Sequence, residues 1–385
     1  MSSKNQQHLT FQSWRGGSQS GAKDLQPGPV AIVTDGKAYT TWAPGFKDEI
    51  LSRVPEADVR LEIDVSELAS RAVGAEGVVG VVWLSHSPAG LSEALGAEGS
   101  KIRWVQLPSA GIEKHAAVIL AHPDIIWTTA KGAFAEPVAE HGLALTLALM
   151  RYIPARVIAT SWGPSAGISL FRSNVVILGA GGIALAYLSL LSPFRCTTQL
   201  VRRNASDPLD LPSNVDPSTV SVHAFDKLDD LLPTADVLFL ACALTAETKG
   251  LVNQRTLKLL PKHGIIVNVG RGGLIVTDAL VEALRSGEVG GAGLDVTDPE
   301  PLPESHPLFS LTTDSGAEEH ESGSEANAAR LVRQRANVII TPHTADTPEM
   351  VRPLLEQRAA ANVKALYERS GRFEGLIRID GEHVY

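Results

Sequence analysis

The chain has 385 residues, of which 44% are hydrophobic, and it carries a formal net charge of -9. This length exceeds what a single hydrophobic core usually supports, so two domains are expected. The acidic balance and the lack of a basic stripe argue against a nucleic-acid surface, and no apolar run reaches the roughly 20 residues of a membrane span. The two cysteines, Cys196 and Cys242, form neither a disulfide framework nor a metal-binding spacing, and both are expected to pack inertly in a reducing compartment.

The first 28 residues are rich in Ser, Gln and Gly and lack the apolar stretch of a secretory signal. Their composition predicts a disordered tail. Because they contain Lys4, Arg15 and Lys23 and no acidic residue before Asp24, a mitochondrial transit peptide stays open as the alternative. The chain as a whole is interpreted as cytoplasmic.

Short apolar runs then alternate with helix-like segments. Runs without polar alternation are typical of strands that are buried on both faces, as in parallel sheets. The expected strands are residues 30–33, 78–84, 102–107, 175–178, 199–201, 237–240, 265–267 and 338–340. They predict the α/β class, with two doubly wound parallel sheets in two domains.

Residues 135–150 carry apolar side chains on every side, which is typical of a buried helix. Breakers follow, so we expect the chain to cross between domains here. These breakers are Pro154, Gly163, Pro164 and Gly167.

A second helix is expected at residues 277–286, with Thr277 as its cap and Gly287 as its left-handed exit. Residues 312–335 combine glutamates with Ser, Gly and Ala and have no strand pattern. This composition predicts a surface insertion.

A glycine-rich turn follows the expected strand at residues 175–178. It contains Gly179, Gly181, Gly182, Ile183 and Ala184, the last in place of a third glycine. A strand that ends in such a turn and opens a helix can bind the pyrophosphate of a dinucleotide, because the N–H groups and the helix dipole favour an anion. A tight turn without a ligand is the alternative.

The end of the next strand predicts which dinucleotide is preferred. Sites that prefer NAD have an acidic residue there, which binds the ribose hydroxyls. Here the position holds Arg202, followed by Arg203, and two guanidinium groups would attract a 2′-phosphate. The sequence therefore favours NADP, with NAD as the second choice; the alternative is that both arginines are solvated surface residues.

Three segments in the second half each end a hydrophobic run on a reactive side chain, namely Arg271, Glu300 and His343. A guanidinium can hold a carboxylate by two parallel hydrogen bonds, and an imidazole beside a carboxylate can move a proton near neutral pH. Reduction of a 2-oxo acid needs these groups, with Arg271 binding the substrate carboxylate, His343 as general acid/base and Glu300 as its partner. Taken singly, Glu300 could be a loop carboxylate and His343 a strand-end residue; together with the glycine turn they favour catalysis.

Several motifs also carry a family resemblance. They are Ala139-Glu-His141, the glycine turn, Ala235-Asp-Val, Asn268 to Leu280, Gly291-Ala-Gly-Leu-Asp295, Glu300-Pro-Leu and Thr341-Pro-His343. In this order they resemble the D-isomer-specific 2-hydroxyacid dehydrogenases, and among them the glyoxylate/hydroxypyruvate reductases, over most of residues 100–350. The interval from Glu300 to His343 is longer than the resemblance implies, and the insertion at 312–335 accounts for the difference.

The resemblance implies a domain layout. A flavodoxin-like substrate domain is expected from residues 29–148 and 344–385, and a Rossmann NAD(P)-binding domain from residues 149–343, with a cleft between them. A homodimer is also implied. A small 2-oxo or 2-hydroxy acid is the expected partner, and neither a metal, a nucleic acid nor a membrane is expected.

Further site residues come from the resemblance alone. The implied cofactor contacts are Ala243, Thr248, Val269, Gly270 and Asp295, the last as a buried acid near the nicotinamide. The family usually has proline at position 243, so the shape of that loop is open. The implied contacts to the substrate carboxylate in the first domain are Ser85, His86, Ala110 and Gly111. His141 is expected to be a structural partner between domains.

A function of another class stays open as the alternative to an enzyme. Corepressors that resemble the C-terminal binding proteins sense a reduced dinucleotide on the same fold, and intact catalytic residues do not exclude this role. A formate dehydrogenase would need an amide in place of Glu300, and a long-chain phosphoglycerate dehydrogenase would carry a further regulatory domain. The preferred prediction is an oxidoreductase that reduces glyoxylate, hydroxypyruvate or a similar 2-oxo acid to the D-2-hydroxy acid.

Overall fold

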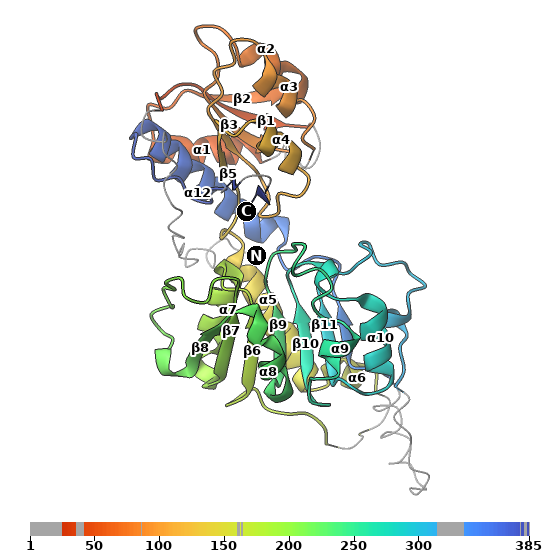
Figure 1. Ribbon diagram of the computed structural model, residues 1–385. Helices are drawn as coiled ribbons and strands as arrows, with labels where there is room; N and C mark the ends of the chain where they lie inside the picture. Colours follow the sequence, from red (N-terminus) through yellow and green to blue (C-terminus); the bar gives the residue numbers. More distant parts are fainter. Residues whose placement is uncertain are drawn as a thin grey trace, which may run out of the picture. The chain divides into compact units, whose positions relative to one another are not determined.

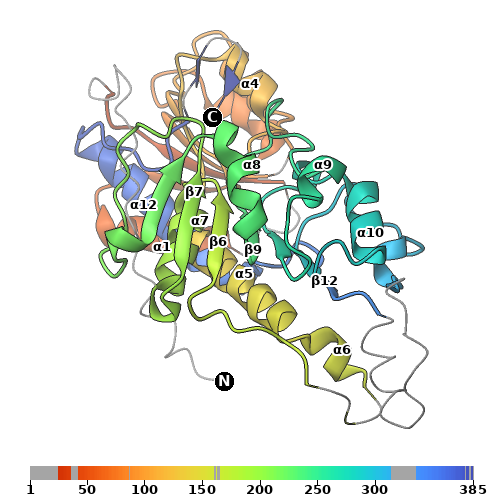
Figure 2. The ribbon, with the colours of Figure 1, turned by 60° about the horizontal axis from the view of Figure 1, so that its bottom comes forward.

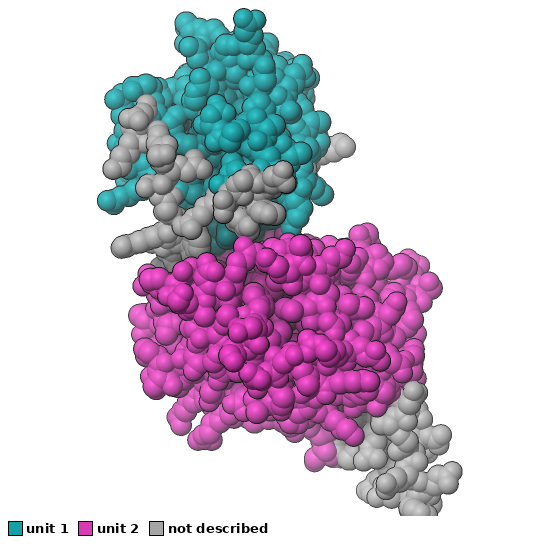
Figure 3. Space-filling view, in the orientation of Figure 1, with its two compact units in different colours: residues 1–134, 347–385 teal, residues 135–346 magenta. Residues whose placement is uncertain are grey.

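The computed structural model of the protein describes residues 25–35, 42–85, 87–159, 162, 165–313, 335–377, 379–380 and 383–384. The chain divides into two compact units, coloured separately in Figure 3. Unit 1 spans residues 1–134 and 347–385, and unit 2 spans residues 135–346. Each unit is built on a parallel sheet with helices around it (Figure 1), so the predicted α/β class with two parallel-sheet domains is confirmed.

Unit 1 contains a five-stranded sheet in the order β2-β1-β3-β4-β5. Its strands are β1 (Val30–Thr34), β2 (Val59–Asp64), β3 (Gly80–Leu84), β4 (Trp104–Gln106) and β5 (Ile126–Thr128). Its helices are α1 (Ala43–Arg53), α2 (Leu68–Arg71), α3 (Leu91–Gly96), α4 (Ala116–Ala121) and α12 (Pro348–Tyr367), and β13 (Ile379–Asp380) pairs antiparallel with β14 (His383–Val384). Alternate residues of β1 enter two cores, Ile32 on the side of α1 and α12 and Val33 on the side of α2, α3 and α4. The central strands are therefore buried on both faces, as their continuous apolar runs predict.

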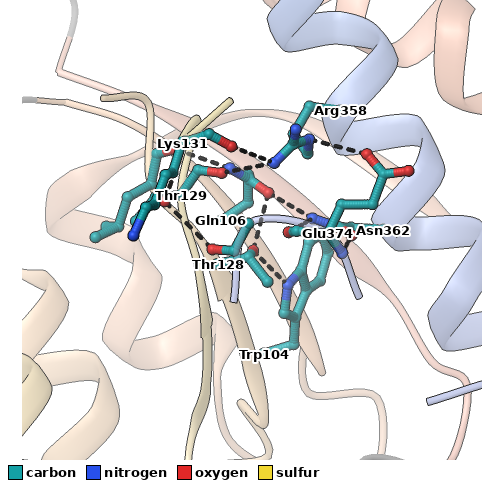
Figure 4. Close-up of polar contacts among 10 residues, drawn as sticks. Trp104, Gln106, Thr128, Thr129, Lys131, Arg358, Asn362 and Glu374 are labelled. Carbon is teal, nitrogen blue, oxygen red and sulfur yellow. Dashed lines mark hydrogen bonds and ion pairs between the residues drawn. The ribbon is translucent and has the colours of Figure 1, made fainter. Parts of the chain in front are cut away.

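A buried polar cluster joins α12 to the sheet of unit 1 (Figure 4). Arg358 of α12 is 1% exposed and donates from Nη1 to the carbonyls of Thr129 and Lys131, at 3.3 and 3.0 Å. Its Nε lies 3.1 Å from Oε2 of Glu374. Burial lowers the pKa of Arg358, and Glu374 opposes this effect. The cluster holds the backbone of residues 129–131, which lead along the chain to the first helix of unit 2.

Unit 2 contains a seven-stranded sheet in the order β12-β11-β10-β9-β6-β7-β8, in which every pairing is parallel. Its strands are β6 (Asn174–Leu178), β7 (Thr197–Val201), β8 (Val220–His223), β9 (Val237–Leu240), β10 (Ile265–Asn268), β11 (Gly291–Leu294) and β12 (Val338–Ile340). Its helices are α5 (Ala135–Met150), α6 (Ile153–Val157), α7 (Gly182–Leu191), α8 (Leu228–Leu231), α9 (Gln254–Leu257) and α10 (Thr277–Arg285). Helix α5 packs on α7 and on β10 and β11, and Figure 2 shows α8 in front of this sheet and α5 behind it.

The predicted elements agree with the structure at most positions. The expected helix at 135–150 is α5, and the runs at 237–240 and 338–340 are β9 and β12. Six strands of the described residues were not predicted, namely β2, β5, β8, β11 and the short pair β13 and β14.

The predicted capping of α10 is wrong at its start and confirmed at its end. Thr277 is the first helical residue, and its hydroxyl donates to the carbonyl of Asp298 instead of capping the turn. Gly287 has φ +69°, the left-handed exit that the sequence predicts.

The chain start and the expected insertion are described only in part. Of the predicted tail, residues 1–24 lie outside the described residues, but the prediction is wrong for residues 25–28, because Leu25 is 8% exposed in the core and the carbonyl of Gly28 accepts from Tyr367. Of the expected insertion, residues 314–334 lie outside the described residues. Its flanks, Thr312 and Arg335, form an antiparallel bridge.

Candidate functional site

The predicted reactive residues of unit 2 share one edge of its sheet. In a parallel sheet the carboxyl ends of all strands meet at the same edge, where ligands of such folds bind. The loops that leave this edge carry the glycine turn after β6, Arg202 after β7, Arg271 after β10, Asp295 and Glu300 after β11, and His343 after β12.

The glycine turn has the local geometry that a pyrophosphate needs. Gly179 has φ +115°, and an added Cβ would lie 2.7 Å from the carbonyl oxygen of Ala241, so only glycine fits there. Gly181 precedes α7 without a side-chain cap, and an added Cβ would meet nothing within 4 Å. The start of α7 therefore faces open space, where its N–H groups can bind an anion.

The two predicted arginines after β7 have different surroundings. The Arg202 guanidinium turns onto its own loop and donates to the carbonyls of Ala205 and Asp207. Arg203 is 48% exposed, and its Nη2 lies 2.8 Å from Oε2 of Glu247. The more exposed guanidinium is thus bound to a carboxylate.

His343 and Glu300 lie side by side, although 43 positions separate them in the sequence. Nδ1 of His343 is 2.6 Å from Oε1 of Glu300, and the two side chains are 47% and 42% exposed. Because Nδ1 faces the carboxylate, Nε2 is the nitrogen left to exchange a proton with a ligand. His343 has φ +52°, an uncommon backbone conformation that its N–H bond to the carbonyl of Asp295, at 2.8 Å, helps to hold.

The loop that carries Arg271 packs on the loop that leads to Glu300. An added Cβ at Gly272 would lie 1.9 Å from the carbonyl oxygen of Thr297, so the two backbones are in direct contact. Nη1 of Arg271 donates to the carbonyl of Gly270, at 2.8 Å. Burial and the neighbouring Asp295 raise the pKa of the Asp346 carboxyl, while His343 and Arg271 oppose the shift.

Asp295 has a role that the motifs did not predict. It is 2% exposed, and its Oδ1 accepts from the Thr341 hydroxyl at 2.6 Å and from the Thr344 N–H at 2.9 Å, while Oδ2 accepts from the Ala345 N–H at 3.2 Å. The carboxylate therefore fixes the backbone on both sides of His343. His141 lies 2.9 Å from the Thr341 hydroxyl and 3.5 Å from the Asp295 carboxylate. Both of these residues belong to unit 2, as His141 itself does, whereas the sequence predicts a partner between domains.

Replacing Asp295 by asparagine is expected to lower the free energy of unfolding by about 1–3 kcal/mol, because the new NH₂ group would face an N–H donor that now binds a carboxylate oxygen. The measurement is the midpoint of urea-induced unfolding. Asp210→Asn, which changes an exposed carboxylate of the same unit, is the control. Equal midpoints for the two variants would show that Asp295 does not hold the loop.

The remaining predicted residues of unit 2 shape their own loops. Thr248 is 5% exposed, and its hydroxyl donates to the carbonyl of Ala243 at 2.7 Å, which closes the loop after β9. Val269 is 5% exposed, and the N–H of Gly270 donates to the Asn268 side chain. Burial raises the pKa of the Cys242 thiol to about 11, so the thiol stays protonated and unreactive.

The predicted substrate residues of the first domain lie in unit 1. Ser85 is 1% exposed, and its hydroxyl donates to Asp35 at 3.1 Å. Ala110 and Gly111 lie in a turn that the Ser109 hydroxyl closes by donating to the carbonyl of Gly111, at 2.7 Å. His86 lies outside the described residues. Within the described part of the chain, no three His, Cys, Asp or Glu side chains are grouped so that they could hold a metal ion, and no helix is long and apolar enough to cross a membrane.

Comparisons with known proteins place the chain in a family. Residues 143–345 match a family model described as D-isomer specific 2-hydroxyacid dehydrogenase, NAD binding domain. The chain is 36% identical over 269 residues to an uncharacterized protein in the proB 3′ region of Corynebacterium melassecola, which covers 68% of this chain and 78% of that protein. It is 30% identical over 225 residues to the human glyoxylate reductase/hydroxypyruvate reductase, which covers 56% of this chain and 66% of the human protein.

A solved structure shows the same fold. It is the D-isomer specific 2-hydroxyacid dehydrogenase from Xanthobacter autotrophicus Py2 in complex with NADPH and MES. The TM-score is 0.68 with 22% sequence identity, over 91% of this chain and 98% of that chain.

Proposed function

This chain belongs to the D-isomer-specific 2-hydroxyacid dehydrogenase family, and we propose that it reduces a small 2-oxo acid, such as glyoxylate or hydroxypyruvate, to the D-2-hydroxy acid. The observation that carries this proposal is the hydrogen bond of 2.6 Å between His343 and Glu300, at the same sheet edge as the glycine turn. A proton donor and a dinucleotide cradle are the two parts that such a reduction needs.

The side chains divide the chemistry among them. A bound reduced dinucleotide supplies the hydride. Arg271 binds the substrate carboxylate through its planar fork and polarises the carbonyl. His343 gives a proton from Nε2 to the carbonyl oxygen as negative charge develops there. Glu300 accepts from Nδ1, which orients the ring.

We propose that the two domains share these roles. Unit 2, residues 135–346, acts as the nucleotide-binding domain, and unit 1, residues 1–134 with 347–385, acts as the substrate domain. The unit boundaries differ from those expected from the sequence, 148/149 and 343/344, and the first differs because α5 packs on α7, β10 and β11 of unit 2. The loop residues proposed to line the cofactor are Ala243, Thr248, Val269, Gly270 and Asp295. The residues proposed to bind the substrate carboxylate beside Arg271 are Ser85, His86, Ala110 and Gly111.

NADP is the proposed preferred cofactor, because Arg202 and Arg203 follow β7 where the adenosine ribose would lie. The double variant Arg202→Asp, Arg203→Ser is expected to weaken NADPH binding by about ten- to several-hundred-fold more than NADH binding, since only NADPH carries the 2′-phosphate. Calorimetric titration with each cofactor measures the two Kd values. Arg255→Asp, at another exposed ion pair of unit 2, is the control. Equal losses for NADPH and NADH would contradict the assignment.

The reaction itself is tested by mixing the protein with NADPH or NADH and each of a panel of 2-oxo acids. Absorbance of the reduced nicotinamide should fall, and the product should be the D-2-hydroxy acid. Tight binding of the cofactor without turnover of any 2-oxo acid would contradict the enzyme and favour a dinucleotide-sensing regulator.

A cytoplasmic homodimer stays a prediction. Two apolar side chains on and after α6 are strongly exposed in the single chain, Val157 at 77% and Trp162 at 98%. We propose that a second copy of the chain covers them, because strongly exposed apolar side chains can mark a protein–protein interface.

A further inference from the structure

An ion pair joins the loops that follow β7 and β9. Arg203 comes from the first loop and Glu247 from the second, with 2.8 Å between Nη2 and Oε2. Strands β7 and β9 are the two neighbours of β6 in the sheet. The pair therefore spans the carboxyl end of β6, where the glycine turn opens α7.

Both loops are closed by bonds of their own. On the β9 side, the Thr248 hydroxyl donates to the carbonyl of Ala243, and the Lys249 N–H donates to the carbonyl of Thr245 at 2.9 Å. On the β7 side, Arg202 donates to two carbonyls of the loop that follows it. These hydrogen bonds hold the backbones of the two loops, and the Glu247 carboxylate therefore lies beside Arg203.

We propose that Glu247 is a specificity-determining residue that favours NADH relative to NADPH. This inference rests on the proposed function, in which Arg203 faces the ribose 2′ position. Sites that prefer NAD carry an acidic residue after the second strand, and here the loop after β9 brings a carboxylate to that side instead. A carboxylate accepts a hydrogen bond from a ribose hydroxyl, but it repels a 2′-phosphate and competes with it for the guanidinium. Glu247 therefore offsets part of the NADPH preference that the arginines give.

The expected effect is moderate, because both side chains are exposed, at 48% and 72%, and water and salt screen their charges. Replacing Glu247 by glutamine is expected to tighten NADPH binding about three- to tenfold. The Kd of NADH should stay the same or rise by up to about threefold. Raising the ionic strength should reduce the gain for NADPH.

The experiment is calorimetric titration of the full chain and its variants with NADPH and with NADH. Glu282→Gln is the matched control, since it removes the same charge from another exposed ion pair of unit 2, with Arg285. The double variant Arg203→Met, Glu247→Gln should lose the tighter NADPH binding that is expected for Glu247→Gln alone.

Tighter NADPH binding by Glu247→Gln, without tighter NADH binding, is the expected result. An unchanged or weaker NADPH affinity, or an equal shift for both cofactors, would overturn the role of Glu247 and leave the proposed function standing. A wild-type chain that binds neither cofactor would contradict the proposed function as well as this inference.

Discussion

Replacing His343 by glutamine is expected to lower kcat for 2-oxo acid reduction by about 10²- to 10⁴-fold, because an amide cannot give a proton to the developing alkoxide. The Kd of NADPH should change little, since the glycine turn and the arginines after β7 belong to other loops of the sheet. Steady-state kinetics measures kcat, and calorimetric titration measures the Kd of NADPH. A wild-type kcat for His343→Gln would show that His343 does not donate the proton.

The chain supplies a matched control for this variant. Nε2 of His263 lies 2.7 Å from Asp236, so unit 2 contains a second histidine–carboxylate pair. Asp236 and His263 precede β9 and β10, which places this pair at the opposite edge of the sheet. His263→Gln should therefore leave kcat unchanged. Glu300→Gln should lower kcat less than His343→Gln, by about 10- to 100-fold, because it keeps an acceptor for Nδ1 and removes only the negative charge of this partner.

The shared sheet edge of the candidate residues follows from one rule of parallel sheets. Arg271 and His343 each follow an apolar run that proves to be a strand, β10 or β12. Since the carboxyl ends of parallel strands share an edge, residues far apart in sequence are brought to the same side. The predicted insertion at 312–335 falls between Glu300 and His343, and the two side chains are nevertheless 2.6 Å apart.

Strand β11 was not predicted because its sequence, Gly-Ala-Gly-Leu, has low strand propensity. The structure gives the reason for the glycines. An added Cβ at Gly293 would lie 3.0 Å from Leu149 of α5, and one at Gly291 would lie 2.6 Å from Asn337. Helix α5 packs tightly over Gly293, and Asn337 leaves no room for a side chain at Gly291. Such requirements are visible only in three dimensions.

The other missed strands lie at sheet edges. β2 and β5 are the edges of the first sheet, and β8 is an edge of the second. Strands β2 and β8 alternate polar and apolar residues, as Val59-Arg-Leu-Glu-Ile-Asp64 shows for β2. Strand β5 is buried, but it is only three residues long. A search for continuous apolar runs finds buried central strands and misses these.

Contacts between distant side chains could not be predicted either. Asp295 lies 46 positions before Thr341, and Arg203 lies 44 positions before Glu247. No local pattern marks such pairs, because each partner alone is an ordinary residue of a loop. The bonds of Asp295 and the ion pair of Glu247 therefore come from the structure alone.

Replacing Arg271 by glutamine is expected to lower kcat/KM for 2-oxo acids by about 10²- to 10⁴-fold. Two charge-assisted hydrogen bonds to the substrate carboxylate would be lost, each worth about 1.5–3 kcal/mol. Arg271→Lys should recover only part of the loss, since an ammonium keeps the charge and lacks the planar fork.

The structure also indicates that the Arg271 variants should leave the neighbouring loops unchanged. Nη1 of Arg271 donates to the carbonyl of Gly270 in its own loop, and the close approach of that loop to Thr297 is made by the neighbouring Gly272. The backbone near Glu300 should therefore keep its place, and the Kd of NADPH should remain close to that of the wild type. Arg285→Gln, at an exposed ion pair of α10, is the control for loss of a positive charge. Equal kinetics for Arg271→Gln and Arg285→Gln would mean that the substrate carboxylate is bound elsewhere.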